Sequence, residues 1–105
     1  MTKRQRTSAY KEFLFKHLKS PRAAAGYLTE SFEEGEETFF LVLKDVAEAH
    51  GGIAPLAKAT NLNREGLYDM LSDKGNPRLS SLSTVLDALG IKVEFRPQVE
   101  RRKAV

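Results

Sequence analysis

The heptapeptide from Asn63 to Asp69, NREGLYD, carries side chains whose chemistry suits contacts with double-stranded DNA. An arginine near the start of a helix can donate two hydrogen bonds to guanine O6 and N7, which makes Arg64 the first candidate for a base contact. Tyr68 is a candidate for a phosphate or a thymine methyl group. The predicted DNA-binding residues are Lys58, Asn63, Arg64, Glu65, Tyr68, Asp69, Lys74 and Arg78.

These residues are expected to play different parts. The three basic residues outside the heptapeptide, Lys58, Lys74 and Arg78, are candidates for phosphate contacts. Glu65 can accept a hydrogen bond from cytosine N4, although carboxylates such as Glu65 and Asp69 are repelled by nearby phosphates. The alternative interpretation is a helical hairpin that only packs against the rest of the domain.

The chain on either side of the heptapeptide has the pattern of a helix-turn-helix over residues 54–72. In this motif a first helix braces a second helix that enters the major groove. Leu56 and Ala57 are expected to face the second helix, and Asn61 suits a left-handed turn. Asn63 is the expected N-cap of the second helix. Three residues form its expected inner side, namely Leu67, Met70 and Leu71.

Gly66 interrupts the second helix of this motif. A glycine inside a helix costs roughly 1 kcal/mol relative to alanine. We expect its role to be a close approach of the backbone, either to the bracing helix or to a DNA phosphate.

The rest of the chain is expected to supply the helices that support this motif. Apolar residues recur at helical spacing over about residues 8–19, 21–34, 36–50 and 79–89. Ser20 before Pro21 is typical of a helix start, and Gly35 and Gly90 are typical of helix ends. The sequence therefore predicts an all-α fold, a compact bundle of about six helices.

One segment departs from the helical pattern. In residues 91–96, Ile91, Val93 and Phe95 alternate with charged residues, which is the spacing of a β-strand. A single strand needs a partner for its backbone groups. We expect these three apolar residues to pair across a two-fold homodimer. The alternative is an extended tail that lies on the domain.

Composition limits the classes of function. The chain of 105 residues has 41% hydrophobic residues and no cysteine, which favours one small cytoplasmic domain. It lacks an apolar run long enough to span a membrane. We expect a basic helical extension at 1–19, a main domain at 20–96 and a flexible basic tail at 97–105.

Catalytic chemistry finds little support in the residue types. His17 lies on an apolar stripe and His50 near a helix end, so both are expected to be structural. Four carboxylates, called the acidic patch below, flank a predicted helix break and are expected to point into water: Glu33, Glu34, Glu36 and Glu37. No nucleophile–base pair or metal site is evident, so the sequence predicts a protein without cofactor, metal or enzymatic activity.

The segments LNREGLY and GNPRLSSLSTVLDALG carry a family resemblance. Residues 20–96 resemble the bacterial addiction-module antidote proteins, which are related to HigA-type antitoxins and to lambda-repressor-like helix-turn-helix domains. The resemblance implies an antitoxin that binds a RelE/ParE-like toxin and, as a dimer, represses its own operon at a palindromic operator.

Two further expectations accompany the resemblance. A basic RNA-cleaving toxin would be attracted to the acidic patch, which makes these four residues candidates for toxin binding. Two other functions stay open on the sequence, a stand-alone prophage-type repressor and a helical module that binds only proteins.

Overall fold

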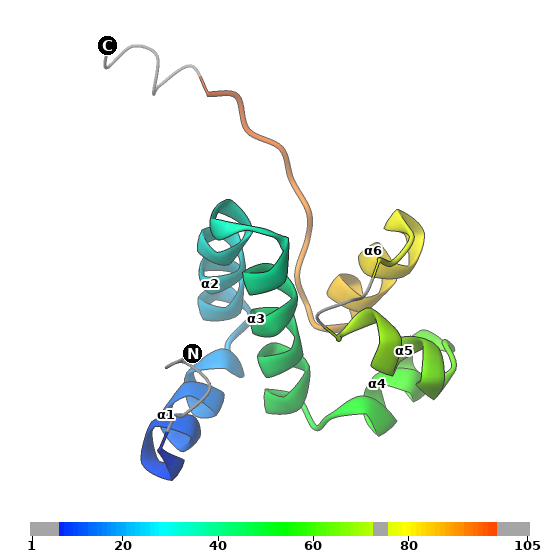
Figure 1. The fold of residues 1–105 in the computed structure, drawn as a ribbon, viewed down its shortest axis with the longest axis horizontal. Coiled ribbons are helices and arrows are strands. Elements are labelled where there is room, and N and C mark those ends of the chain that lie inside the picture. The colour runs from blue at the N-terminus through cyan, green and yellow to red at the C-terminus, as the bar shows by residue number, and fades with distance from the viewer. Residues whose placement is uncertain (1–6, 73–75, 99–105) are drawn as a thin grey trace.

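The computed structural model describes residues 7–72 and 76–98, and this part of the chain contains six helices and no strand (Figure 1). The helices are α1 (Ser8–Leu18), α2 (Pro21–Glu34), α3 (Glu36–Ala49), α4 (Ile53–Thr60), α5 (Arg64–Met70) and α6 (Leu79–Ala88). The predicted all-α class and the number of helices are confirmed. Among the described residues no helix is long and apolar enough to cross a membrane.

Short polar side chains fix the starts of the first two helices. The Thr7 hydroxyl accepts a hydrogen bond from the Tyr10 N–H at 3.1 Å, and the Ser20 hydroxyl accepts one from the Ala23 N–H at 3.3 Å. Each bond satisfies a backbone donor that the first turn leaves without a helical partner. Pro21 follows Ser20 at the first helical position, as the sequence predicts.

Glycines end α3 and allow the chain to turn into α4. Gly51 and Gly52 have φ values of 110° and 93°. The Gly52 N–H donates to the Ala47 carbonyl at 2.9 Å, and the Gly51 N–H donates to the Glu48 carbonyl at 3.2 Å. These two bonds form a Schellman motif, in which glycine adopts the left-handed conformation at no side-chain cost.

The hydrophobic core runs through α3, which joins two groups of helices. On one side α3 packs against α1 and α2, and on the other it contacts α4, which in turn packs against α5 and α6. Figure 1 shows the two groups on opposite sides of α3. The largest fully buried side chains come from both groups and from α3: Leu18, Leu43, Val46, Leu67 and Val85. The pair α4 and α5 is therefore joined to α1 and α2 through α3.

The apolar spacing over residues 8–19 predicts one buried stripe, and the packed side of α1 differs from it. The predicted stripe consists of Tyr10, Phe13, Leu14, His17 and Leu18. Leu14 and Leu18 are buried as expected, but Tyr10, Phe13 and His17 of the same stripe are exposed. Phe15, which lies off that stripe, packs against the core instead. The covered face of α1 is therefore rotated toward Leu14, Phe15 and Leu18, which pack into the core.

The structure has no β-strand at 91–96 in the single chain, so the predicted strand and its pairing across a homodimer stay predictions. Residues 91–98 leave α6 as a segment without regular secondary structure (Figure 1). Among the described residues no second strand lies beside this segment to accept or donate backbone hydrogen bonds. Ile91 packs against the core, whereas Val93 and Phe95 are exposed, so the described residues do not bury the other two apolar side chains of the alternation.

Candidate nucleic-acid interface

The turn between α4 and α5 is built by a left-handed residue and a hydroxyl. Asn61 has φ 66° and ψ 20°, the only positive φ outside glycine in the described residues. The Thr60 hydroxyl donates to the Leu56 carbonyl at 2.8 Å and accepts from the Leu62 N–H at 3.2 Å. Asparagine tolerates this conformation better than most residues. The predicted place of Asn61 at the corner is confirmed.

The contact between the two helices is apolar, as the sequence predicts. Leu56 of α4 is buried, and Ala57 and Leu62 pack against the core beside it. The inner side of α5 and its C-cap are formed by the predicted residues, since Leu67, Met70 and Leu71 are all buried. Because this face is fixed by packing, the opposite face of α5 must point to solvent.

The outward face of α5 contains the predicted base-reading residues. Asn63, Arg64, Glu65, Tyr68 and Asp69 are all exposed. Tyr68 is 60% exposed, which is high for a large aromatic side chain and leaves its hydroxyl free to reach a phosphate. The N-cap and first turn of α5 therefore expose one amide, one arginine and one carboxylate to solvent.

The glycine in α5 accommodates the helix cap. The Asn63 side-chain oxygen Oδ1 accepts a hydrogen bond from the Gly66 N–H at 2.6 Å. A Cβ atom placed on Gly66 would lie 3.0 Å from that same oxygen, and no atom of α4 would lie within 4 Å of it. The expected approach to the bracing helix is therefore wrong. The close neighbour is the capping side chain itself.

The candidate phosphate contacts flank α5. Lys58 lies in the last turn of α4 and Arg78 at the N-cap of α6, and both are exposed. Lys74 lies outside the described residues. Over α4, α5 and α6 with its N-cap, the described cations Lys58, Arg64 and Arg78 are matched by equally many carboxylates. The surface is therefore nearly neutral, and any DNA affinity must depend on the placement of these cations.

The acidic patch lies at the opposite group of helices. Glu33 and Glu34 end α2, Gly35 is the joint, and Glu36 and Glu37 begin α3. All four carboxylates are exposed, and those on α3 lie in its first turn, where the helix dipole favours negative charge. These predicted toxin-binding residues therefore lie on α2 and α3, in a different group of helices from α5.

A hollow of about 260 Å³ adjoins this patch and was not predicted. Its lining includes Glu34 together with residues from α1, α2 and α3, namely Tyr10, Tyr27, Glu30, Ser31, Thr38, Leu41, Val42 and Asp45. Asp45 is buried and takes part in an interaction. Its position on α3 between apolar residues gave no sign of this, because helical spacing alone does not reveal which neighbour covers a polar side chain.

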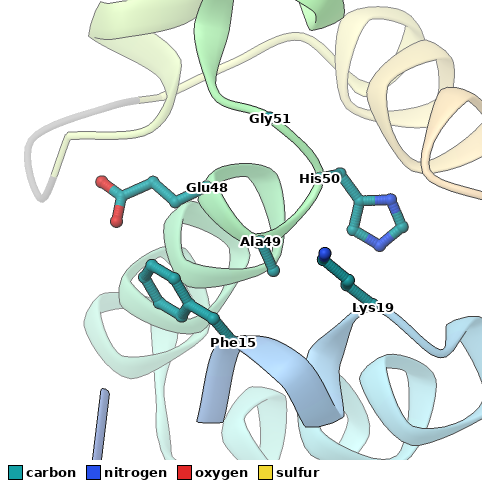
Figure 2. A pocket seen from close by; sticks show the side chains of 6 residues that line it. All are labelled: Phe15, Lys19, Glu48, Ala49, His50 and Gly51. Atoms are coloured by element: carbon teal, nitrogen blue, oxygen red, sulfur yellow. The ribbon is translucent and has the colours of Figure 1, made fainter. Parts of the chain in front are cut away.

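A second, shallow hollow of about 650 Å³ lies between the ends of α1 and α3 (Figure 2). His50 lines it and places its Nε2 at 3.2 Å from the Leu18 carbonyl oxygen, a contact that ties the two helix ends together. In Figure 2 the Glu48 carboxylate points away from Lys19 and His50, so these groups do not converge on one point. His17 stacks on Phe13 with ring centroids 6.1 Å apart.

No group of three or more potential metal ligands occurs among the residues that the structure describes.

Comparison with known proteins finds matches over nearly all of the residues that the structure describes. The family model described as "Probable addiction module antidote protein" matches residues 6–97, a range that includes α1. An uncharacterized protein of Haemophilus influenzae is 32% identical over 92 residues, which span 86% of this chain and 94% of that relative. No solved structure gives a significant match.

Proposed function

The chain belongs to the family of probable addiction module antidote proteins, and we propose that it acts in two ways, by binding a toxin directly and by repressing its own operon through α4 and α5. The family implies a partner toxin in general. A RelE/ParE-like nuclease is the partner we propose. Both activities are binding events that require no catalytic group, and they place the protein in the cytoplasm with its DNA.

The DNA-binding part rests on one observation, the geometry from Leu56 to Leu71. A bracing helix, a left-handed asparagine at the corner and a capped second helix with its inner side buried are the parts of a helix-turn-helix. In such motifs the N-terminal residues of the second helix meet base edges. Arg64 is the first residue of α5, which supports the proposal that it makes a bidentate contact to guanine.

The near-neutral surface around α5 bears on how tightly DNA is held. Each phosphate that a cation neutralises adds about 0.9 to the steepness with which the logarithm of the binding constant falls with the logarithm of the salt concentration. Lys58, Arg64 and Arg78 are the described cations at hand, so one copy supplies few such contacts. Two copies on a palindromic operator double the number, which is why we propose that the homodimer is the form that represses.

The acidic patch supports the proposal of a basic toxin. Its carboxylates are exposed and project where α2 meets α3, away from α5. A surface of one charge sign speeds the encounter with a partner of the opposite sign and orients it. Toxin and operator can then be bound at the same time, because the two surfaces belong to different groups of helices.

A mobility-shift titration on the DNA upstream of the gene tests the groove face of α5. Arg64→Ala should lose about 1–3 kcal/mol of binding free energy on the cognate site, because the guanine contact is lost. Lys58→Ala should weaken all sequences alike and reduce the salt slope by about 1 for each copy bound. Arg22→Ala on α2 is the matched control and should bind as the unchanged chain does. Full affinity in Arg64→Ala would refute the proposed orientation of α5.

A further inference from the structure

The C-terminal segment 91–98, called the arm below, leaves the domain from a fixed point. The Ile91 N–H donates to the Leu86 carbonyl at 2.8 Å and the Gly90 N–H donates to the Asp87 carbonyl at 3.0 Å. With Gly90 at φ 81°, these bonds form a Schellman motif at the end of α6. Ile91 also packs against the core. The direction in which the arm starts is therefore set by α6.

Beyond Ile91 the arm is exposed along its whole described length. Phe95 is 93% exposed, more than any other large hydrophobic residue in the described chain, and Val93 is 49% exposed. Figure 1 shows the arm running from α6 into open space. Apolar side chains at every second position of an extended segment would form one face of a strand. An exposed apolar face of this kind is typical of a surface that binds a partner.

A second copy of the arm is a partner whose fit can be tested on the sequence. In an antiparallel pair of identical strands, the two-fold axis lies either at one residue, which then faces its own copy, or between two residues. An axis at a residue places apolar residues of the arm opposite apolar ones, whereas an axis between residues places apolar residues opposite charged ones and so divides the apolar side chains between the two faces. Only registers centred on a residue therefore build one continuous apolar face.

The register centred on Val93 satisfies every cross-strand pair. It places Lys92 opposite Glu94 of the second copy, and by symmetry this pair occurs twice. It also places Ile91 opposite Phe95, so that the exposed ring covers the residue that already touches the core. Opposite charges and apolar pairs facing each other directly are the arrangements that stabilise antiparallel strands.

Neighbouring registers are each in conflict with the sequence. Centring on Glu94 places that carboxylate opposite itself and Lys92 opposite Arg96. Centring on Lys92 places its ammonium group opposite itself. Centring on Phe95 places Pro97, which has no N–H, inside the ladder opposite Val93. In the register centred on Val93, Pro97 falls beyond the last pair.

We propose that the arms of two copies form a two-stranded antiparallel ribbon over residues 91–95, with the two-fold axis at Val93. The ribbon rests on the homodimer of the proposed function and specifies its interface. Two strands alone are only marginally stable in water and need an apolar face packed on the domain. Ile91 supplies that contact in each copy. Because the arm begins at a rigid cap on α6, the ribbon holds the two α5 helices at a fixed separation.

Charge exchange between positions 92 and 94 tests this register. Lys92→Glu and Glu94→Lys each convert two attractive pairs into repulsive ones. Sedimentation at low salt should show each variant dissociating on the order of tenfold more readily. The double variant restores opposite charges and should dimerise as the unchanged chain does. An equimolar mixture of the two single variants should form heterodimers more tightly than either forms homodimers.

The controls separate the register from the dimer itself. In this register position 96 faces Gly90, so Arg96→Glu should leave dimerisation unchanged. In the register centred on Glu94 the new carboxylate would face Lys92 and tighten association. In the register centred on Phe95 it would face Glu94 and weaken association. Positions 92, 94 and 96 are exposed, so circular dichroism should show all variants folded. A dimer indifferent to charge exchange refutes the ribbon and leaves a dimer through another surface. A monomeric unchanged chain at micromolar concentration refutes both ribbon and homodimer, while toxin binding is measured separately.

Discussion

The Asn63 side chain offers a test of how the start of α5 is stabilised. Its oxygen accepts from the Gly66 N–H at 2.6 Å and provides the only side-chain cap of α5. Helix α5 has 7 residues, too few to be stable without packing or capping. Removal of an N-cap side chain costs about 1 kcal/mol of stability. A larger loss is not expected, because Gly66 is exposed and its N–H can form a hydrogen bond with water instead.

Thermal unfolding followed by circular dichroism measures this loss. Asn63→Ala should lower Tm by about 4–8 °C, the shift that 1 kcal/mol produces in a domain of this size. Asn63→Ser keeps a good capping oxygen and should retain most of the stability. The exposed Asn76, which follows the undescribed residues 73–75, is the matched control, and Asn76→Ala should change stability by no more than about 0.5 kcal/mol.

The same series separates capping from DNA recognition. If the amide of Asn63 also contacts DNA, Asn63→Ser should unfold normally yet bind the operator more weakly. Equal unfolding temperatures for Asn63→Ala and the unchanged chain would contradict the capping role and with it the physical reason given for the start of α5.

Three further changes test the surrounding structure. Gly66→Ala should stabilise the protein by close to 1 kcal/mol when Asn63 is alanine but by less when Asn63 is present, because its Cβ would lie 3.0 Å from Oδ1; equal gains in both backgrounds would exclude the conflict. Leu67→Ala in the core should cost about 3 kcal/mol in urea unfolding, against at most about 0.5 for the exposed Leu79→Ala. Reversing the acidic patch to lysine should abolish toxin binding in calorimetry and spare operator binding, and retained toxin affinity would exclude the patch as the toxin surface.

Local signals explain why the helices and their ends are predictable. Ser20 with Pro21, Gly35, Asn63 and Gly90 each act within a few residues, through a cap or a turn conformation, and each lies where the sequence places it. The buried side of α4 and α5 follows for the same reason, since two neighbouring amphipathic helices must bury their apolar faces against each other.

Features that depend on distant contacts are not predictable in this way. The buried side of α1 is set by α2 and α3, so the stripe that includes Phe13 and His17 is only half covered. Residues 91–96 have the alternation of a strand, but a strand exists only where another pairs with it. The burial of Asp45 and the two hydrogen bonds of the Thr60 hydroxyl also arise from neighbours that spacing does not identify.

The position of Gly66 is a smaller case with the same lesson. Its type indicates that a side chain would be in the way, and sequence reasoning places the obstacle on the bracing helix or on DNA. The structure excludes the bracing helix and shows the capping asparagine three residues earlier as the near neighbour, while the approach to a DNA phosphate stays a prediction. A glycine thus indicates a need for space, but the neighbour that fills the space is known only from the fold.

Growth of cells that express the adjacent reading frame tests the central claim most directly. The frame is expressed from a promoter that this chain does not regulate, alone and together with the chain, so that rescue reports direct neutralisation and not repression. We expect growth arrest with the neighbouring protein alone. Growth should return when the chain is added, also as the Arg64→Ala variant. A harmless neighbour, as expected of a stand-alone repressor, or arrest that the chain does not relieve, would contradict the proposed antitoxin.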